Sequence, residues 1–132
     1  MTEYVTKDSG KRLHYGSGMV RDTQEGKPDY TLIEPKMLRR WAELMTRGAE
    51  KYGRRNWEQA DSPEEYDRFL ASGLRHHYQY LAGETDEDHA AAVMFNLAAA
   101  EYVKAKLDAS SDAERVATDT LIFHGNSFCN GD

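Results

Sequence analysis

The fold is decided by HAAAVMFNLAAAEYVKAKL, residues 89–107. Residues 90–100 carry no charged side chain, so a helix formed here is apolar on nearly every side. Such a helix is buried inside a bundle or clamped between subunits. We expect it to be capped by Thr85, with Asp88 in its first turn, and to run to about Leu107. This stretch predicts an all-α fold with one central helix.

Two further helices precede it, and their start signals are clear. The first is expected to begin at Pro35 and stop at Gly53, because proline suits the first helical position and glycine ends helices. The second is expected to follow a capping box of Ser62, Pro63 and Glu65 and to end at Gly83. Helical spacing predicts the inner face of this second helix as Tyr66, Phe69, Leu70, Gly73, Leu74, His77 and Leu81.

The remaining segments lack a strong periodic pattern. Residues 1–30 predict a loop or arm with a short strand near Leu13, and a weaker helical stretch from Asp112 to Leu121 leads into a polar tail. The chain is therefore expected to be one all-α domain, residues 1–132, with an N-terminal loop or arm at 1–30, a helical core at 31–109 and a tail at 110–132. The architecture expected is a compact three- to four-helix bundle, with the tail either poorly ordered or serving as an oligomer arm.

Composition limits the function classes. The chain has 132 residues and a net charge of −6, and this acidic balance disfavours nucleic acid as a partner. No apolar run approaches the length of a membrane span, and no secretory signal is visible, so no membrane association is expected. The single cysteine, Cys129, excludes a disulfide within the chain and fits a reducing, cytoplasmic location. A bundle this small is expected to cover the apolar surface of its central helix by forming a homo-oligomer, either a dimer or a tetramer.

Polar side chains interrupt the apolar face of the central helix. At about 100° per residue, Asp88, His89 and Asn96 share one face, and Ala92 between them leaves room for a ligand. Buried polar groups need partners, since each unsatisfied one costs about 1–3 kcal/mol. The three polar residues together indicate a binding or catalytic site. The alternative explains each one separately: Asp88 caps the helix, His89 contacts a backbone carbonyl, and Asn96 cross-links two helices.

Histidines on the second helix lie close to an acidic loop. The segment Arg75-His76-His77 is expected to place His77 at the centre of the apolar face, with His76 on its flank. The loop that follows carries Glu84, Asp86, Glu87 and Asp88. Oxygen and imidazole ligands of this kind suit Mg²⁺, Mn²⁺ or Co²⁺. The alternative is an acidic first turn favoured by the helix dipole.

Other charged residues give weaker signals. Glu43 and Glu50 fall opposite the apolar stripe of the first helix, so a role for Glu50 needs a second subunit over that face. Cations that could meet phosphates occur in three places, namely Arg21 and Lys27, Lys51 and Arg54, and Arg75. Asn56-Trp57 adds an amide and an aromatic plane, which suits base recognition.

Several segments resemble motifs of a known family. They are GMVRD (18–22), GKP (26–28), GAEKYGRRNW (48–57), LRH (74–76), GETDEDH (83–89) and FN (95–96). In order and at this spacing, they resemble the phage dATP/dGTP diphosphohydrolases, of the MazZ type, which are grouped with the all-α MazG-like NTP pyrophosphatases. In the wider MazG pattern, the metal ligands are a Glu-x-x-Glu and a Glu-x-x-Asp on two helices. This chain departs from that pattern, because its one Glu-x-x-Glu, Glu84 to Glu87, falls at the expected start of a helix.

The resemblance implies an activity and an assignment of residues. It implies metal-dependent cleavage of purine deoxynucleoside triphosphates to the monophosphate and diphosphate by an oligomer, serving in some phages to make 2-aminoadenine DNA. Together with the patterns above, it makes His76, Asp88 and His89 the expected catalytic residues. The candidate metal ligands are Glu50, Glu84, Glu87 and Asp88. The candidate substrate-binding residues are Arg21, Lys27, Lys51, Arg54, Asn56, Trp57, Arg75 and Asn96.

Two other functions stay open. The first is an HD-type triphosphohydrolase, suggested by histidines on one helix and an Asp/His pair on the next, although here the order is Asp88-His89. The second is a helical oligomer that binds a nucleotide or a protein without catalysis.

Overall fold

The computed structural model describes residues 3–126, and side chains as far as residue 115. It divides into two units, residues 1–33 and 34–132, which are described separately. The expected tail beyond residue 126, with Cys129, lies outside the described residues.

The N-terminal unit contains a small hairpin. Strand β1 (Arg12–His14) pairs antiparallel with β2 (Val20–Asp22), and Leu13 lies opposite Arg21. The expected short strand near Leu13 is therefore present, and its partner strand was not expected. A single 3₁₀ turn, η1 (Tyr30–Leu32), ends the unit.

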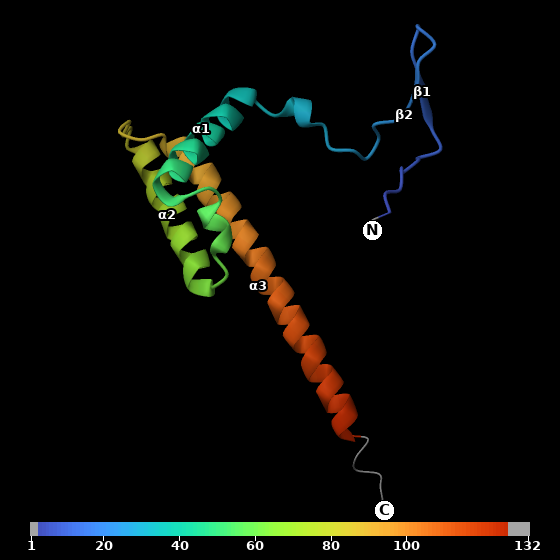
Figure 1. Cartoon of the computed structure of the whole chain (residues 1–132). Coiled ribbons are helices and arrows are strands. Elements are labelled where there is room, and N and C mark those ends of the chain that lie inside the picture. The colour runs from blue at the N-terminus through green and yellow to red at the C-terminus, as the bar shows by residue number, and fades with distance from the viewer. Residues whose placement is uncertain (1–2, 127–132) are drawn as a thin grey trace, which may run out of the picture. The chain divides into compact units, whose positions relative to one another are not determined.

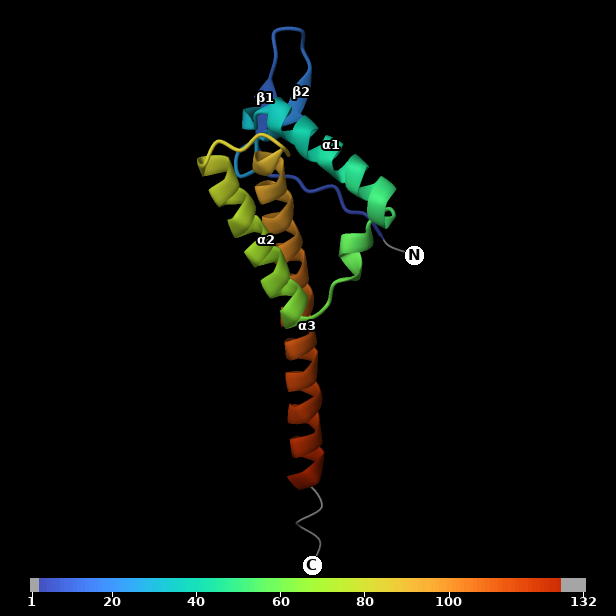
Figure 2. The same cartoon turned by 90° about the vertical axis from the view of Figure 1, so that its left-hand side faces the viewer.

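The helical unit contains α1 (Pro35–Tyr52), the 3₁₀ turn η2 (Asn56–Gln59), α2 (Pro63–Leu81) and α3 (His89–Asn126). The predicted all-α class is confirmed. Helix α2 begins as the sequence predicts, because the Ser62 side chain accepts a hydrogen bond from the Glu65 amide, 3.2 Å away. Helices α2 and α3 lie side by side and run in opposite directions (Figures 1 and 2). Helix α3 also contacts α1.

The start of α3 differs from the prediction. The helix begins at His89 and not after Thr85, because Asp88 is the capping residue. Its Oδ1 accepts a hydrogen bond from the amide of Ala91 at 3.1 Å. Downstream, the stretch expected as a separate helix is a continuation of α3, since residues 107–115 contain no glycine or proline to stop it.

The inner face of α2 also differs from the prediction. His76 is buried, with 9% of its surface exposed, and His77 is exposed, so the expected roles of the two are reversed. Leu70, Leu74 and Leu81 were predicted to face inward but are 40%, 58% and 66% exposed. The face toward α3 is formed instead by Phe69, Gly73 and His76, which meet Phe95, Asn96 and His89 of α3.

Small residues at this crossing set the distance between the two helices. A Cβ atom built on Gly73 would lie 3.2 Å from the Cβ of Asn96. On the α3 side, Ala92 and Ala99 are almost fully buried. Small side chains let the helix backbones approach, so this crossing holds the two helices in register.

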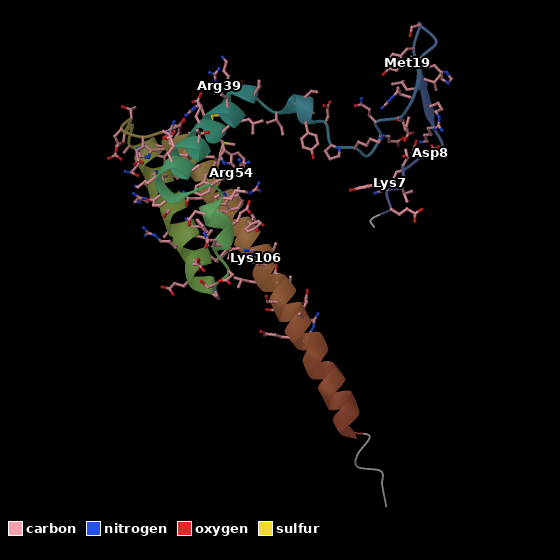
Figure 3. All side chains as sticks on the ribbon, in the orientation of Figure 1. Lys7, Asp8, Met19, Arg39, Arg54 and Lys106 are labelled. Carbon is pink, nitrogen blue, oxygen red and sulfur yellow. The ribbon has the colours of Figure 1, made fainter. Side chains whose placement is uncertain are left out.

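One lysine fastens the turn between α1 and α2 to α3. Lys106, labelled in Figure 3, donates hydrogen bonds through Nζ to the carbonyl oxygens of Glu58 and Ala60. The carbonyls at the end of η2 are thereby paired, and the turn carrying Asn56 and Trp57 is held against α3. None of the helices in the described part of the chain is long and apolar enough to span a membrane.

The crossing generates a stability prediction. Gly73→Val forces a branched side chain into the 3.2 Å gap at Asn96, and we expect it to lower the free energy of unfolding by about 2 kcal/mol. The matched control is Gly48→Ala in α1, where a Cβ meets nothing within 4 Å and helix propensity gives a gain of about 0.5–1 kcal/mol. Urea denaturation measures both, and an unchanged stability for Gly73→Val would contradict this account of the crossing.

Candidate functional site

A cavity of about 520 Å³ lies among α1, α2, α3 and the segment between α1 and η2. Its wall includes apolar side chains such as Leu44, Phe69 and Phe95. Cavities of this size with a few placed polar groups hold small molecules or cofactors. The predicted site residues that line it are Lys51, Asn56, Trp57, Arg75, His76, Glu87, Asp88 and Asn96.

Other predicted residues lie elsewhere. Glu50, Glu84 and Arg54 are exposed and do not line this cavity, and Figure 3 labels Arg54. Arg21 and Lys27 belong to the N-terminal unit, where they line a second cavity of about 290 Å³ with Tyr15 and Asp22. Of the three predicted groups of cations, Arg21 and Lys27 line the smaller cavity, Lys51 and Arg75 line the larger one, and Arg54 lines neither.

Cations dominate the charge of the larger cavity. The basic side chains that line it are Arg47, Lys51, Arg55, Arg68 and Arg75, and the acidic ones are Glu87 and Asp88. Arg47, Arg55 and Arg68 were missed as site residues. A signal was present, because Arg47 precedes Lys51 by one helical turn and Arg68 precedes Arg75 by two, so each pair shares a helix face.

Two histidines meet at the end of this cavity. His76 of α2 and His89 of α3 place their Nδ1 atoms 2.8 Å apart, and both rings are buried. His89 Nε2 lies 2.8 Å from a carboxylate oxygen of Asp86. Burial lowers the pKa of His76, and the charge of Arg75 lowers it further, so its imidazole is neutral at pH 7.

Two groups of side chains here could hold a metal ion. The first is His76, Glu87 and His89, and the second is Glu84, Asp86 and His89. In each group the candidate ligand atoms all lie within 4.8 Å of one another. Metal-ligating residues are therefore present, with both nitrogen and oxygen donors.

Asp88 is held by other contacts. Its carboxylate oxygens receive hydrogen bonds from Nε and Nη2 of Arg40 at 2.8 and 2.7 Å, in addition to the Ala91 amide. The guanidinium of Arg40 lowers the pKa of Asp88 to about 2. Arg40 was not among the predicted residues, and the capping role of Asp88 is the alternative that the sequence left open.

The side chains of Asn96 and Trp57 are both held in place by contacts with α3. The Nδ2 of Asn96 donates to the carbonyl of Ala92 at 2.8 Å, so the amide bonds to its own helix and does not cross-link to another. The ring of Trp57 packs edge-to-face against Phe95 and Tyr102, with centroids 6.3 and 5.0 Å away. Both residues line the cavity with their orientation set by these contacts.

A comparison with protein families identifies the chain's relatives. The family model described as "dATP/dGTP diphosphohydrolase, N-terminal" matches residues 17–113, which is well over half of the chain. The chain belongs to this family. No curated protein and no solved structure matches it.

Membership of the dATP/dGTP diphosphohydrolase family confirms the resemblance found in the sequence, and it indicates dATP/dGTP diphosphohydrolase activity in general. The matched region includes β2, α1, α2 and the first part of α3. Every predicted site residue falls within it.

The ion pair of Arg40 with Asp88 predicts acid-dependent stability. Because the pKa of Asp88 is lowered from 3.8 to about 2, the pair stabilises the fold above about pH 4 and loses this effect as pH falls toward 2. Removing the guanidinium in Arg40→Gln should lower the melting temperature at pH 7, since Asp88 loses two charge-assisted hydrogen bonds.

The control is Arg39→Gln, which breaks a more exposed pair with Glu43 in the same helix. Thermal melts from pH 2 to 7 should show the wild type and Arg40→Gln converging at the acid end and Arg39→Gln matching the wild type throughout. An equal loss of stability in both variants would refute a special role for Arg40.

Proposed function

We propose that this diphosphohydrolase-family chain hydrolyses dATP and dGTP to the monophosphate and diphosphate with a divalent metal ion. The observation that carries the proposal is the basic cavity. In a chain of net charge −6, cations gather around one hollow of about 520 Å³. A triphosphate is the ligand class that needs several cations at one place.

The cavity divides by chemistry into two regions. Arg47, Lys51, Arg68 and Arg75 are suited to the phosphates, with Lys51 and Arg75 neutralising charge that develops on the departing diphosphate. Asn56 and Trp57 are suited to the purine, the amide by hydrogen bonding and the indole by its surface. Arg21 and Lys27 line a cavity within the N-terminal unit, and they stay candidate phosphate ligands there.

The donor set at the end of the cavity fits a divalent metal. Glu87 is the predicted carboxylate that both lines the cavity and clusters with imidazole rings, and Glu84 belongs to the second cluster. Asp88 would join them on leaving Arg40, and Glu50 would contribute only if a second copy of the chain covered its face of α1. A bound Mg²⁺, Mn²⁺ or Co²⁺ supplies charge neutralisation and an acidified water. His76, neutral and at the cavity wall, is placed to ligate or to accept a proton.

The setting of the reaction follows from the resemblance. We propose a phage-encoded protein of the host cytoplasm that removes dATP and supplies dGMP, shaping the nucleotide pool for 2-aminoadenine DNA. Hydrolysis of dATP depletes the base that is to be replaced. The other product, dGMP, already carries the 2-amino group and would feed synthesis of the 2-aminoadenine nucleotide.

The reaction is tested by product analysis. Untagged protein is incubated with each of the four dNTPs and Mg²⁺, Mn²⁺ or Co²⁺, and the products are separated by ion-exchange chromatography. We expect dAMP and dGMP with diphosphate. Release of deoxynucleoside and triphosphate would replace this proposal by the HD-type reaction, and binding without turnover would replace it by the non-catalytic module.

The basic cavity predicts the effect of losing one phosphate contact. Arg75→Gln should raise KM for dGTP or lower kcat/KM by roughly 10- to 100-fold, the value of a charge-assisted hydrogen bond. Lys104→Gln is the control, because Lys104 is exposed on α3 and does not line the cavity. Steady-state kinetics decide the point, and equal kinetics for the two variants would contradict the assignment.

We also propose that the chain forms a homo-oligomer through the face of α2 and α3 that faces away from the cavity. Leu70 and Leu74 each follow by one residue a position that packs toward α3, and Leu97 follows Asn96 in the same way. On antiparallel helices these positions fall on one side. That side exposes 40–58% of each of these leucines, and a second copy would cover an equivalent face.

Leu74→Lys places a charge at the centre of this face. If the face is the contact between copies, the variant should elute as a monomer in light-scattering chromatography, whereas Leu38→Lys, at an exposed leucine of α1, should keep the mass of the wild type. A wild-type mass of one chain would contradict the proposal directly.

A further inference from the structure

The contact between His76 and His89 poses a hydrogen-bonding question. Their Nδ1 atoms lie 2.8 Å apart, and 9% and 2% of the two residues is exposed. Two imidazole nitrogens at this distance require either one shared proton or one shared cation, because two lone pairs repel.

Asp86 decides which atom of His89 carries the proton. Its carboxylate lies 2.8 Å from His89 Nε2, and an ionised carboxylate only accepts hydrogen bonds. His89 therefore holds its proton on Nε2, and its Nδ1 lone pair points at His76.

This arrangement has the features of a metal-ligating histidine. Such a residue binds the ion with one ring nitrogen and donates the N–H of the other to a carboxylate, which orients the ring. The spacing also fits, since two nitrogens bound at right angles to one ion, with bonds of about 2.0–2.1 Å, lie about 3 Å apart. Glu87 brings a carboxylate oxygen into the same cluster.

We propose that His76, His89 and Glu87 bind one first-row transition-metal ion, with Asp86 orienting His89 as a positioning residue. The donor set of two imidazoles and one carboxylate selects Mn²⁺, Co²⁺ or Zn²⁺ over Mg²⁺, which prefers oxygen ligands. His76 and Glu87 line the cavity, so the ion lies where phosphates reach it. Its use in catalysis rests on the proposed function, whereas the site itself does not.

The second cluster, Glu84, Asp86 and His89, is the competing arrangement. It shares His89, but its other two members are both exposed carboxylates, whereas the first cluster has a second buried imidazole in His76. In that arrangement Glu84 matters and Glu87 does not. The two clusters are therefore separated by two exposed glutamates, whose replacement by glutamine leaves the fold intact.

The test measures metal binding with no nucleotide present. Untagged, metal-free protein is titrated with Co²⁺ and with Mg²⁺ by calorimetry, and the visible absorption of Co²⁺ reports nitrogen ligation. We expect Co²⁺ to bind at least 10-fold more tightly than Mg²⁺. His76→Gln and Glu87→Gln should each weaken Co²⁺ at least 10-fold, and Asp86→Asn by 10- to 100-fold.

His77→Gln is the matched control, because His77 is the adjacent, exposed histidine on the same helix. It should bind Co²⁺ like the wild type. Circular dichroism checks that His76→Gln is folded, and Glu87→Gln and Asp86→Asn change exposed residues that do not hold the core. A second readout is the ¹⁵N shift of the histidine rings, where Zn²⁺ should move Nδ1 of His76 and His89 and leave His77 unchanged.

The metal-binding outcomes test the proposed site whether or not the protein hydrolyses a dNTP. Equal binding of Co²⁺ and Mg²⁺, or unchanged Co²⁺ binding in His76→Gln, overturns the site. Weakening by Glu84→Gln with none by Glu87→Gln overturns it in favour of the exposed cluster. Tight, His76-dependent Co²⁺ binding without hydrolysis of any dNTP supports the site and overturns the proposed function.

Discussion

The close crossing of α2 and α3 at Gly73 and Asn96 is the constraint on which the site depends. Because Gly73 has no side chain, the two helices approach closely enough for His76 to reach His89. The same approach buries Asn96 beside the cavity, with its amide held by the Ala92 carbonyl. A wider crossing would separate the histidines and admit water between them. Polar groups can be buried here because each one has a partner.

Electrostatics sets what the cavity can hold. The chain is acidic as a whole, yet its main cavity is lined by more cations than carboxylates. Of the two acidic lining residues, Asp88 is neutralised by Arg40. An excess of positive charge in a hollow bounded by apolar side chains focuses the field there, which favours a multiply charged anion. This charge pattern and the family match point to the same substrate class by independent routes.

Local signals in the sequence were sufficient for most of the fold and less so for the site. Ser62, Pro63 and Glu65 predicted the start of α2, because a capping box depends on neighbouring residues alone. The exchange of His76 and His77 was an error of about 100° around one helix, and it arose because leucines were counted as core when they lie on an uncovered face. The cap of α3 was assigned to Thr85 because both Thr85 and Asp88 have side chains suited to capping, and the structure shows Asp88 accepting from the Ala91 amide. Arg47, Arg55 and Arg68 were missed since a cation's role depends on which cavity it meets.

The central claim is that the cavity among α1, α2 and α3 is the triphosphate site. The most direct test is to titrate ¹⁵N-labelled protein with α,β-methylene-dGTP, which cannot be cleaved between these phosphates, and to follow the amide signals. We predict that the largest shifts fall on residues 44–57, 68–76 and 87–96, the segments that line the cavity. Shifts confined to the N-terminal hairpin, or to the exposed leucines of α2, would contradict the account.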